Sequence, residues 1–116
     1  MIKIFLGKPL DAAHAHAMLQ RLSGRQHQVL TAVTMKQADI VAQELCTTNV
    51  CIRKLKRHEI EAYISTNEPF GKAGGYGIQG LASIFVSHIA GSYSGVVGLP
   101  IYETSELIKK FGFLLL

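Results

Sequence analysis

The sequence predicts a mixed α/β (α+β) domain in which a largely antiparallel sheet is flanked by helices. Segment 27–35 alternates apolar and polar residues as strands do, and segment 40–53 is expected to be a long strand or a pair of strands. The polar turn at 36–39 between them predicts an antiparallel hairpin. Helical segments precede and follow this hairpin. With 116 residues, of which 48% are hydrophobic and 17% charged, the chain is expected to fold as a single domain spanning 1–116.

Glycine and proline bound the elements before the hairpin. The short apolar run 2–6 predicts a strand that Gly7 ends. Pro9 suits the first turn of a helix, and segment 10–22 predicts that helix, with Gly24 as its stop. Its inward residues are expected to be Ala13, Ala17, Met18 and Leu22.

Four further elements follow the hairpin. Segment 57–65 predicts a short helix with an apolar side, and 84–88 predicts a strand. After a turn at Gly91, segment 93–97 predicts another strand. Pro100 opens a last helix that Gly112 stops; its packing residues are expected to be Leu107, Ile108 and Phe111.

The most distinctive feature is the glycine density of segments 68–80 and 91–100. Glycine lets backbone N–H groups approach an anion without interference from a Cβ, which suggests a nucleotide site. A Walker A loop is excluded, because Ala73 follows the Gly-Lys pair where that motif needs Ser or Thr. Gly75, Gly77 and Gly80 have the spacing of a dinucleotide-binding fingerprint. This interpretation is disfavoured, because the sequence predicts neither the strand that must precede these glycines nor the helix that must follow them.

Two lysines are candidate phosphate ligands. Lys8 stands just before a helix start, where unpaired N–H groups would also attract a phosphate, although an exposed turn lysine is an equally good interpretation. Lys72 lies among small residues that leave room for an anion, or it could pair with Glu68.

Gln79 is the candidate for reading a base. Its amide donates and accepts at once, which suits O4 and N3–H of uracil or thymine, although it could equally hold its own loop through backbone bonds. Tyr76 and Tyr93 could stack on a base or pack in the core. We therefore assign substrate binding to five residues: Lys8, Lys72, Gln79, Gly77 and Gly80.

Other functional classes find little support. Cys46 and Cys51 lack metal-binding spacing and would face opposite sides of a strand, so both are expected to be free thiols. Histidines and acids are scattered, so no protein-built metal site is expected. The basic run 53–58 lacks any RNA-module signature, and no apolar run approaches the roughly 20 residues of a membrane helix. The expectation is a cytoplasmic protein that binds neither nucleic acid nor membrane.

Several segments, in order and nearly end to end, resemble the Maf family of nucleoside triphosphate pyrophosphatases: 7–11, 18–19, 22–24, 27–33, 68–80 and 91–100. The versions Tyr-Gly-Ile-Gln-Gly at 76–80 and Gly-Ser-Tyr at 91–93 resemble the dTTP/UTP branch. The resemblance implies a Maf/inosine triphosphatase-like fold, hydrolysis to the monophosphate and pyrophosphate with Mg or Mn, and inhibition of septum formation. It also implies that Lys8 binds phosphate and that Gln79 selects the base.

The chain departs from the family pattern in places. Gly71 stands where the family often has aspartate and Gly95 where asparagine is frequent, so no role is transferred to them. The family's Ser-x-Ser-Pro-Arg-Arg loop and Asp-Thr pair have no counterpart before Lys8. We expect a C-terminal portion of the fold without its general base, so the catalytic residues are unknown and the metal ligands are not identifiable. We also expect a homodimer or larger assembly. The alternative function is a catalytically inactive nucleotide-binding or interaction module.

Overall fold

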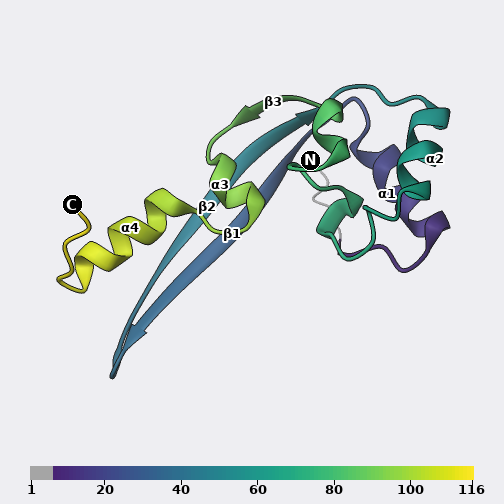
Figure 1. The fold of residues 1–116 in the computed structure, drawn as a ribbon. Coiled ribbons are helices and arrows are strands. Elements are labelled where there is room, and N and C mark those ends of the chain that lie inside the picture. The colour runs from purple at the N-terminus through teal and green to yellow at the C-terminus, as the bar shows by residue number, and fades with distance from the viewer. Residues whose placement is uncertain (1–6) are drawn as a thin grey trace. The chain divides into compact units, whose positions relative to one another are not determined.

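The computed structural model describes residues 7–116, so the strand expected at 2–6 lies outside the described residues. It has a three-stranded antiparallel sheet in the order β1-β2-β3 and is a mixed α/β fold, as predicted (Figure 1). The elements are α1 (Ala12–Leu22), β1 (Gln26–Gln37), β2 (Ile40–Ile52), α2 (Arg57–Ser65), the 3-10 helices η1 (Ala73–Gly75) and η2 (Leu81–Phe85), β3 (Val86–Ala90), α3 (Tyr93–Val97) and α4 (Ile101–Lys110). None of the helices in the described part of the chain is long and apolar enough to cross a membrane.

The chain divides into two compact units. Among the described residues, the first unit contains 7–27 with Cys51–His88, and the second contains Gln28–Val50 with Ile89–Leu116. Strands β1 and β2 contribute residues to both units.

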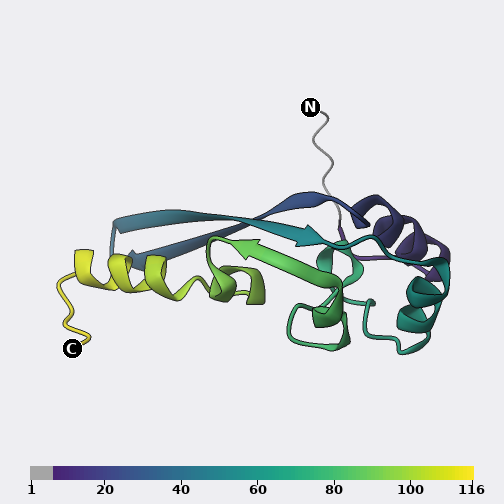
Figure 2. The same ribbon diagram turned by 90° about the horizontal axis from the view of Figure 1, so that it is seen from above.

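The first unit is built around the contact between α1 and α2, which lie side by side in Figures 1 and 2. The Asp11 side chain accepts a hydrogen bond from the His14 N–H and so caps the start of α1. Gly24 follows the helix with φ +66°, a conformation that favours glycine. The buried residues of the pair are Ala15, Met18, Leu19 and Leu22 on α1 and Ile60 and Tyr63 on α2. The expected burial of Ala13 and Ala17 is wrong, because both are exposed on the opposite face.

The second unit packs α3 and α4 with the hairpin. Strand β2 buries Cys46, Thr48 and Val50, which alternate along it. Thr48 Oγ1 accepts a hydrogen bond from the Ser92 N–H at 2.9 Å. Cys46 and Cys51 are both free, as expected from the sequence.

Two of the expected strands are corrected. The segment expected as a strand at 93–97 is helix α3, because the Ser92 hydroxyl accepts a hydrogen bond from the Gly95 N–H and caps a helical turn. The strand expected at 84–88 begins later, at Val86, because η2 occupies the residues before it. The last helix ends as predicted before Gly112, which has φ +87°, and it buries Leu107.

Candidate functional site

The site candidates of the first unit gather on segment 71–81, here called the glycine loop. Gly71, Gly74 and Gly75 have φ values of +85°, +76° and +78°. Side chains rarely adopt this left-handed region, so these three positions explain why the loop is rich in glycine. The loop leads through η1 to η2 without a strand before it, which agrees with the absence of a dinucleotide fingerprint.

The segment that carries Lys8 lies against the glycine loop. The Gly74 N–H donates to the Gly7 carbonyl at 3.0 Å. Pro9 is buried, and its ring approaches Gly75. The structure therefore places the backbone on either side of Lys8 next to the loop, and Lys8 itself is exposed.

Lys72 extends along the glycine loop rather than toward Glu68. A Cβ added at Gly77 would lie 2.8 Å from Lys72 Cε and 3.7 Å from Nζ, so Gly77 makes room for this side chain. Among residues 7–116, Lys72 forms no ion pair with Glu68. The alternative interpretation of Lys72 as the salt-bridge partner of Glu68 is not supported.

Tyr63 of α2 holds the loop at Gly77. The Gly77 N–H donates to the Tyr63 hydroxyl at 3.1 Å. Tyr63 is buried, and burial together with the neighbouring Glu68 carboxylate raises the pKa of its phenol. The phenol therefore stays neutral, and its oxygen is available as an acceptor.

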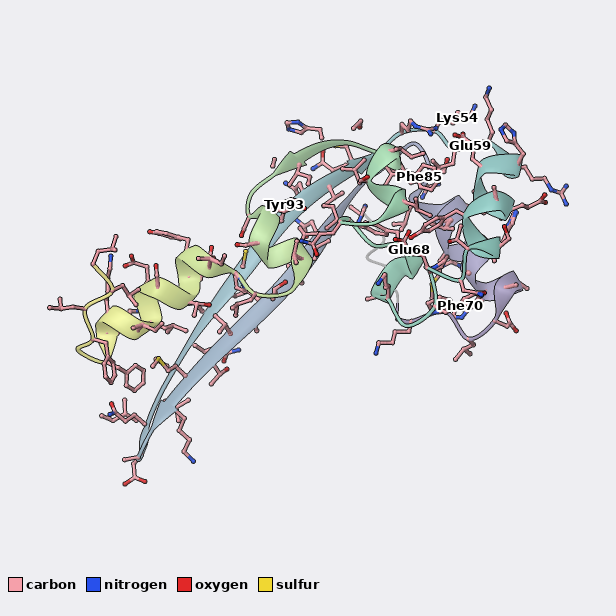
Figure 3. All side chains as sticks on the ribbon, viewed as in Figure 1. Lys54, Glu59, Glu68, Phe70, Phe85 and Tyr93 are labelled. Carbon is pink, nitrogen blue, oxygen red and sulfur yellow. The ribbon has the colours of Figure 1, made fainter. Side chains whose placement is uncertain are left out.

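Glu68 holds the loop on the other side of Gln79. Its Oε1 atom accepts a hydrogen bond from the Leu81 N–H at 3.0 Å. The carboxylate occupies the space that a side chain at Gly80 would fill, so Gly80 permits this close approach. Glu68 is labelled in Figure 3 beside the segment that follows α2.

Tyr76 is engaged with His27 at the start of β1. His27 Nε2 lies 2.7 Å from the Tyr76 hydroxyl, and the two rings are perpendicular with centroids 5.5 Å apart. Burial lowers the pKa of His27 and raises the pKa of Tyr76 to about 12. Of the two tyrosines considered for base stacking, Tyr76 thus has a partner within the protein, and Tyr93 belongs to the second unit with 51% of its surface exposed.

Gln79 lies between the two anchored positions and is exposed. Its neighbour Ile78 is buried, so the backbone directs one side chain inward and the next outward. Within the described residues the Gln79 amide forms no hydrogen bond, and the loop is held by Tyr63 and Glu68 instead. The alternative interpretation, a glutamine that holds its own loop, finds no support.

The five residues assigned to substrate binding fall into one region. Gly77, Gly80, Lys72 and Gln79 belong to the glycine loop, and the Lys8 segment is bonded to it through Gly7. Sequence reasoning missed Tyr63 and His27 as partners of the loop and saw Glu68 only as a possible partner of Lys72. The glycines at 77 and 80 leave space for Lys72 and Glu68, but the sequence alone does not say which side chain fills that space.

A metal centre is not built by these residues. Residues 7–116 contain no group of three or more His, Cys, Asp or Glu side chains that could hold a metal ion. Within residues 7–116 we therefore assign no metal ligand.

Comparison with known proteins gives consistent matches along the chain. The family model described as Maf-like protein matches residues 1–111. A relative from Bordetella parapertussis, named dTTP/UTP pyrophosphatase, is 52% identical over 109 residues, covering 94% of this chain and 53% of the relative. Relatives of the same name from Ralstonia nicotianae and Albidiferax ferrireducens are 54% and 49% identical, covering 90% and 96% of this chain and 51% and 55% of their own lengths. The chain thus spans about half the length of these curated relatives.

Proposed function

Since this chain belongs to the Maf-like family, we propose that the protein is a nucleoside triphosphate pyrophosphatase that hydrolyses dTTP and UTP to the monophosphate and pyrophosphate. Its relatives at about 50% identity are named for this activity. The observation on this chain that carries the proposal is the exposed Gln79 amide on a loop anchored on both sides.

Gln79 would select the base. A free amide presents a donor and an acceptor side by side, which complements O4 and N3–H of a uracil or thymine ring. Because the described part of the chain offers the amide no other partner, base binding would not have to break an internal hydrogen bond.

Lys8 and Lys72 would hold the phosphates. Both are exposed cations beside a loop of glycines, where an anion can approach the backbone closely. The Gly77 N–H is already bonded to Tyr63, so Gly77 and Gly80 would act by leaving space rather than by donating their N–H groups. No step of hydrolysis is assigned to a residue, and the general base is unknown.

The test is pyrophosphate release from dTTP, UTP and dGTP in the presence of Mg²⁺ or Mn²⁺, with single variants Lys8→Ala, Lys72→Ala and Gln79→Ala. Gln79→Ala is expected to reduce the preference for dTTP over dGTP, and the lysine variants are expected to weaken all three nucleotides. Gln20→Ala and Lys36→Ala are matched controls, because both residues are exposed and outside the loop. Equal behaviour of Gln79→Ala and Gln20→Ala contradicts the base-reading role.

A second candidate function is a nucleotide-binding module without turnover. The observation that favours it is the lack of a three-residue acidic or metal-ligating cluster within residues 7–116, because general bases and metal ligands contribute orders of magnitude to such reactions. Binding of dTTP without pyrophosphate release would support this second function.

We also propose that the protein self-associates into a dimer or a larger assembly. Within the described residues β1 is an edge strand, and the hairpin exposes Leu30, Val41 and Leu45 at 52%, 59% and 61%. Long uncovered edges favour pairing with another chain. Light scattering at micromolar concentration tests this: a dimer or larger species that Leu30→Lys weakens is expected, and a monomer contradicts it. Effects on septum formation and a cytoplasmic location stay predictions.

A further inference from the structure

The glycine loop is fixed at two points that bracket Gln79. On one side the Gly77 N–H donates to the buried Tyr63 hydroxyl at 3.1 Å, and on the other the Leu81 N–H donates to Glu68 Oε1 at 3.0 Å. Tyr63 comes from α2, and Glu68 comes from the segment after it. The loop is therefore held by groups that lie outside it.

Both anchors come from outside the loop. Burial, and after it the Glu68 carboxylate, raises the pKa of the Tyr63 phenol. We call them the Tyr63–Glu68 clamp. Figure 3 labels Glu68 in this region of the first unit.

Three features of the loop make the clamp close-fitting. Gly80 has no side chain, and the Glu68 carboxylate fills that space. Within the loop, the side chain of Ile78 is buried. Between them Gln79 is exposed and has no partner within residues 7–116. The clamp thus fixes the backbone on both sides of Gln79, whose amide is free to bind a ligand.

From this geometry we propose that Tyr63 and Glu68 are positioning residues that orient Gln79 for discrimination between bases. The inference rests on the proposed function, because it assumes that Gln79 reads the base. Without the clamp the amide is still present, but its backbone samples several orientations, so base selectivity falls and phosphate affinity does not.

The experiment uses the full chain and measures dissociation constants for dTTP, dGTP and inorganic tripolyphosphate. Tyr63→Phe removes only the hydroxyl, and Glu68→Ala removes the carboxylate. The conservative Glu68→Gln keeps an oxygen that can accept from the Leu81 N–H and is expected to retain selectivity. Tyr102→Phe and Glu61→Ala are the matched controls, because Tyr102 is 69% exposed and, among the described residues, Glu61 pairs only with the exposed Arg57.

For Tyr63→Phe and Glu68→Ala we expect the dGTP-to-dTTP ratio of dissociation constants to fall about tenfold, toward that of Gln79→Ala, with tripolyphosphate affinity within about twofold of the unmodified chain. Amide hydrogen exchange at residues 77–81 is expected to accelerate about tenfold in both variants without any nucleotide. A simple loss of fold would weaken every ligand alike and would not be rescued by Glu68→Gln.

Failure of this inference and failure of the proposed function give different results. If Gln79→Ala loses selectivity while Tyr63→Phe and Glu68→Ala keep it, the clamp has no positioning role and the proposed function stands. If the unmodified chain does not distinguish dTTP from dGTP, the base-reading function fails. The positioning role for base discrimination then fails with it, and accelerated exchange at residues 77–81 in both variants shows only that the clamp fixes this loop.

Discussion

The close approach of Glu68 to Gly80 leads to a quantitative prediction for Gly80→Ala. Gly80 has φ −97°, which lies outside the left-handed region that favours glycine, so the effect should come mainly from the added side chain. An added Cβ would fall on the Glu68 carboxylate and displace it from the Leu81 N–H. Loss of a hydrogen bond to a charged acceptor costs about 1.5 to 3 kcal/mol. The alanine returns about 0.4 to 1 kcal/mol by restricting the unfolded chain, so the net loss should be about 0.5 to 2.6 kcal/mol.

The assay is urea unfolding followed by circular dichroism, in a double-mutant cycle of Gly80→Ala and Glu68→Ala. With Glu68 already truncated there is no carboxylate to displace, so Gly80→Ala should be neutral or slightly stabilising in that background. Gly7→Ala is the control, because among residues 7–116 no heavy atom apart from its chain neighbours lies within 4 Å of its added Cβ. Additive effects of the two substitutions would refute the reasoning, since the predicted cost depends on the contact between them.

Three other predictions follow from described contacts. Hydrogen bonds from Arg53 and from the Lys56 N–H lower the pKa of Glu59 from its ordinary value of about 4.5 to about 2. Between pH 4.5 and pH 2 the unfolded chain therefore binds more protons at this residue than the folded chain does. The stabilisation that Glu59 contributes is therefore present above about pH 4.5 and is lost as the pH falls toward 2. When the free energy of unfolding is measured against pH in acid, Glu59→Gln should flatten this dependence, and Glu61→Gln should not (Figure 3 labels Glu59). Gly95→Ala should destabilise by about 1 to 3 kcal/mol in urea unfolding, because overpacking costs that much and the new Cβ would lie 2.8 Å from Cys46 Sγ. Adding Cys46→Ala to Gly95→Ala should restore part of the lost stability. If it restores none, the proposed contact between the new Cβ and Cys46 Sγ is contradicted. Gln79→Glu should shift binding from dTTP toward dGTP, since a carboxylate only accepts and guanine offers two adjacent donors; an unchanged dTTP-to-dGTP ratio in equilibrium binding counts against base reading by Gln79.

Much of the fold was predictable because local signals agree with it. Helix α2 has the predicted bounds Arg57–Ser65, and the helices before and after the hairpin end near Gly24 and Gly112 as expected. The hairpin was predictable from alternation interrupted by a polar turn. These features depend on residues close together in sequence.

One error arose in a short segment that has too few residues to show a period, and another arose from alanines on a longer helix. Helix α3 has five residues, and its two valines indicated a strand, whereas the Ser92 cap decided for a helical turn. On the inward face of α1, the predicted burial of Met18 and Leu22 is confirmed, whereas Ala13 and Ala17 are exposed; alanines are compatible with either face of a helix.

The site was predictable by residue type but not by contact. The glycine density and the amide of Gln79 indicated the loop, and the structure adds that the loop is held from elsewhere. Gly77 bonds to Tyr63, which lies 14 positions away, and Tyr76 bonds to His27, which lies 49 positions away. Such pairings depend on tertiary packing, and no local pattern specifies them.

The central claim is that the protein hydrolyses pyrimidine triphosphates selected through Gln79. The most direct measurement is pyrophosphate release by this chain from dTTP beside dGTP, with Gln79→Ala in parallel. The account predicts faster release from dTTP than from dGTP and a loss of that preference in Gln79→Ala. Absence of release from either nucleotide would contradict hydrolysis by this chain, and release that ignores the base would contradict the role of Gln79.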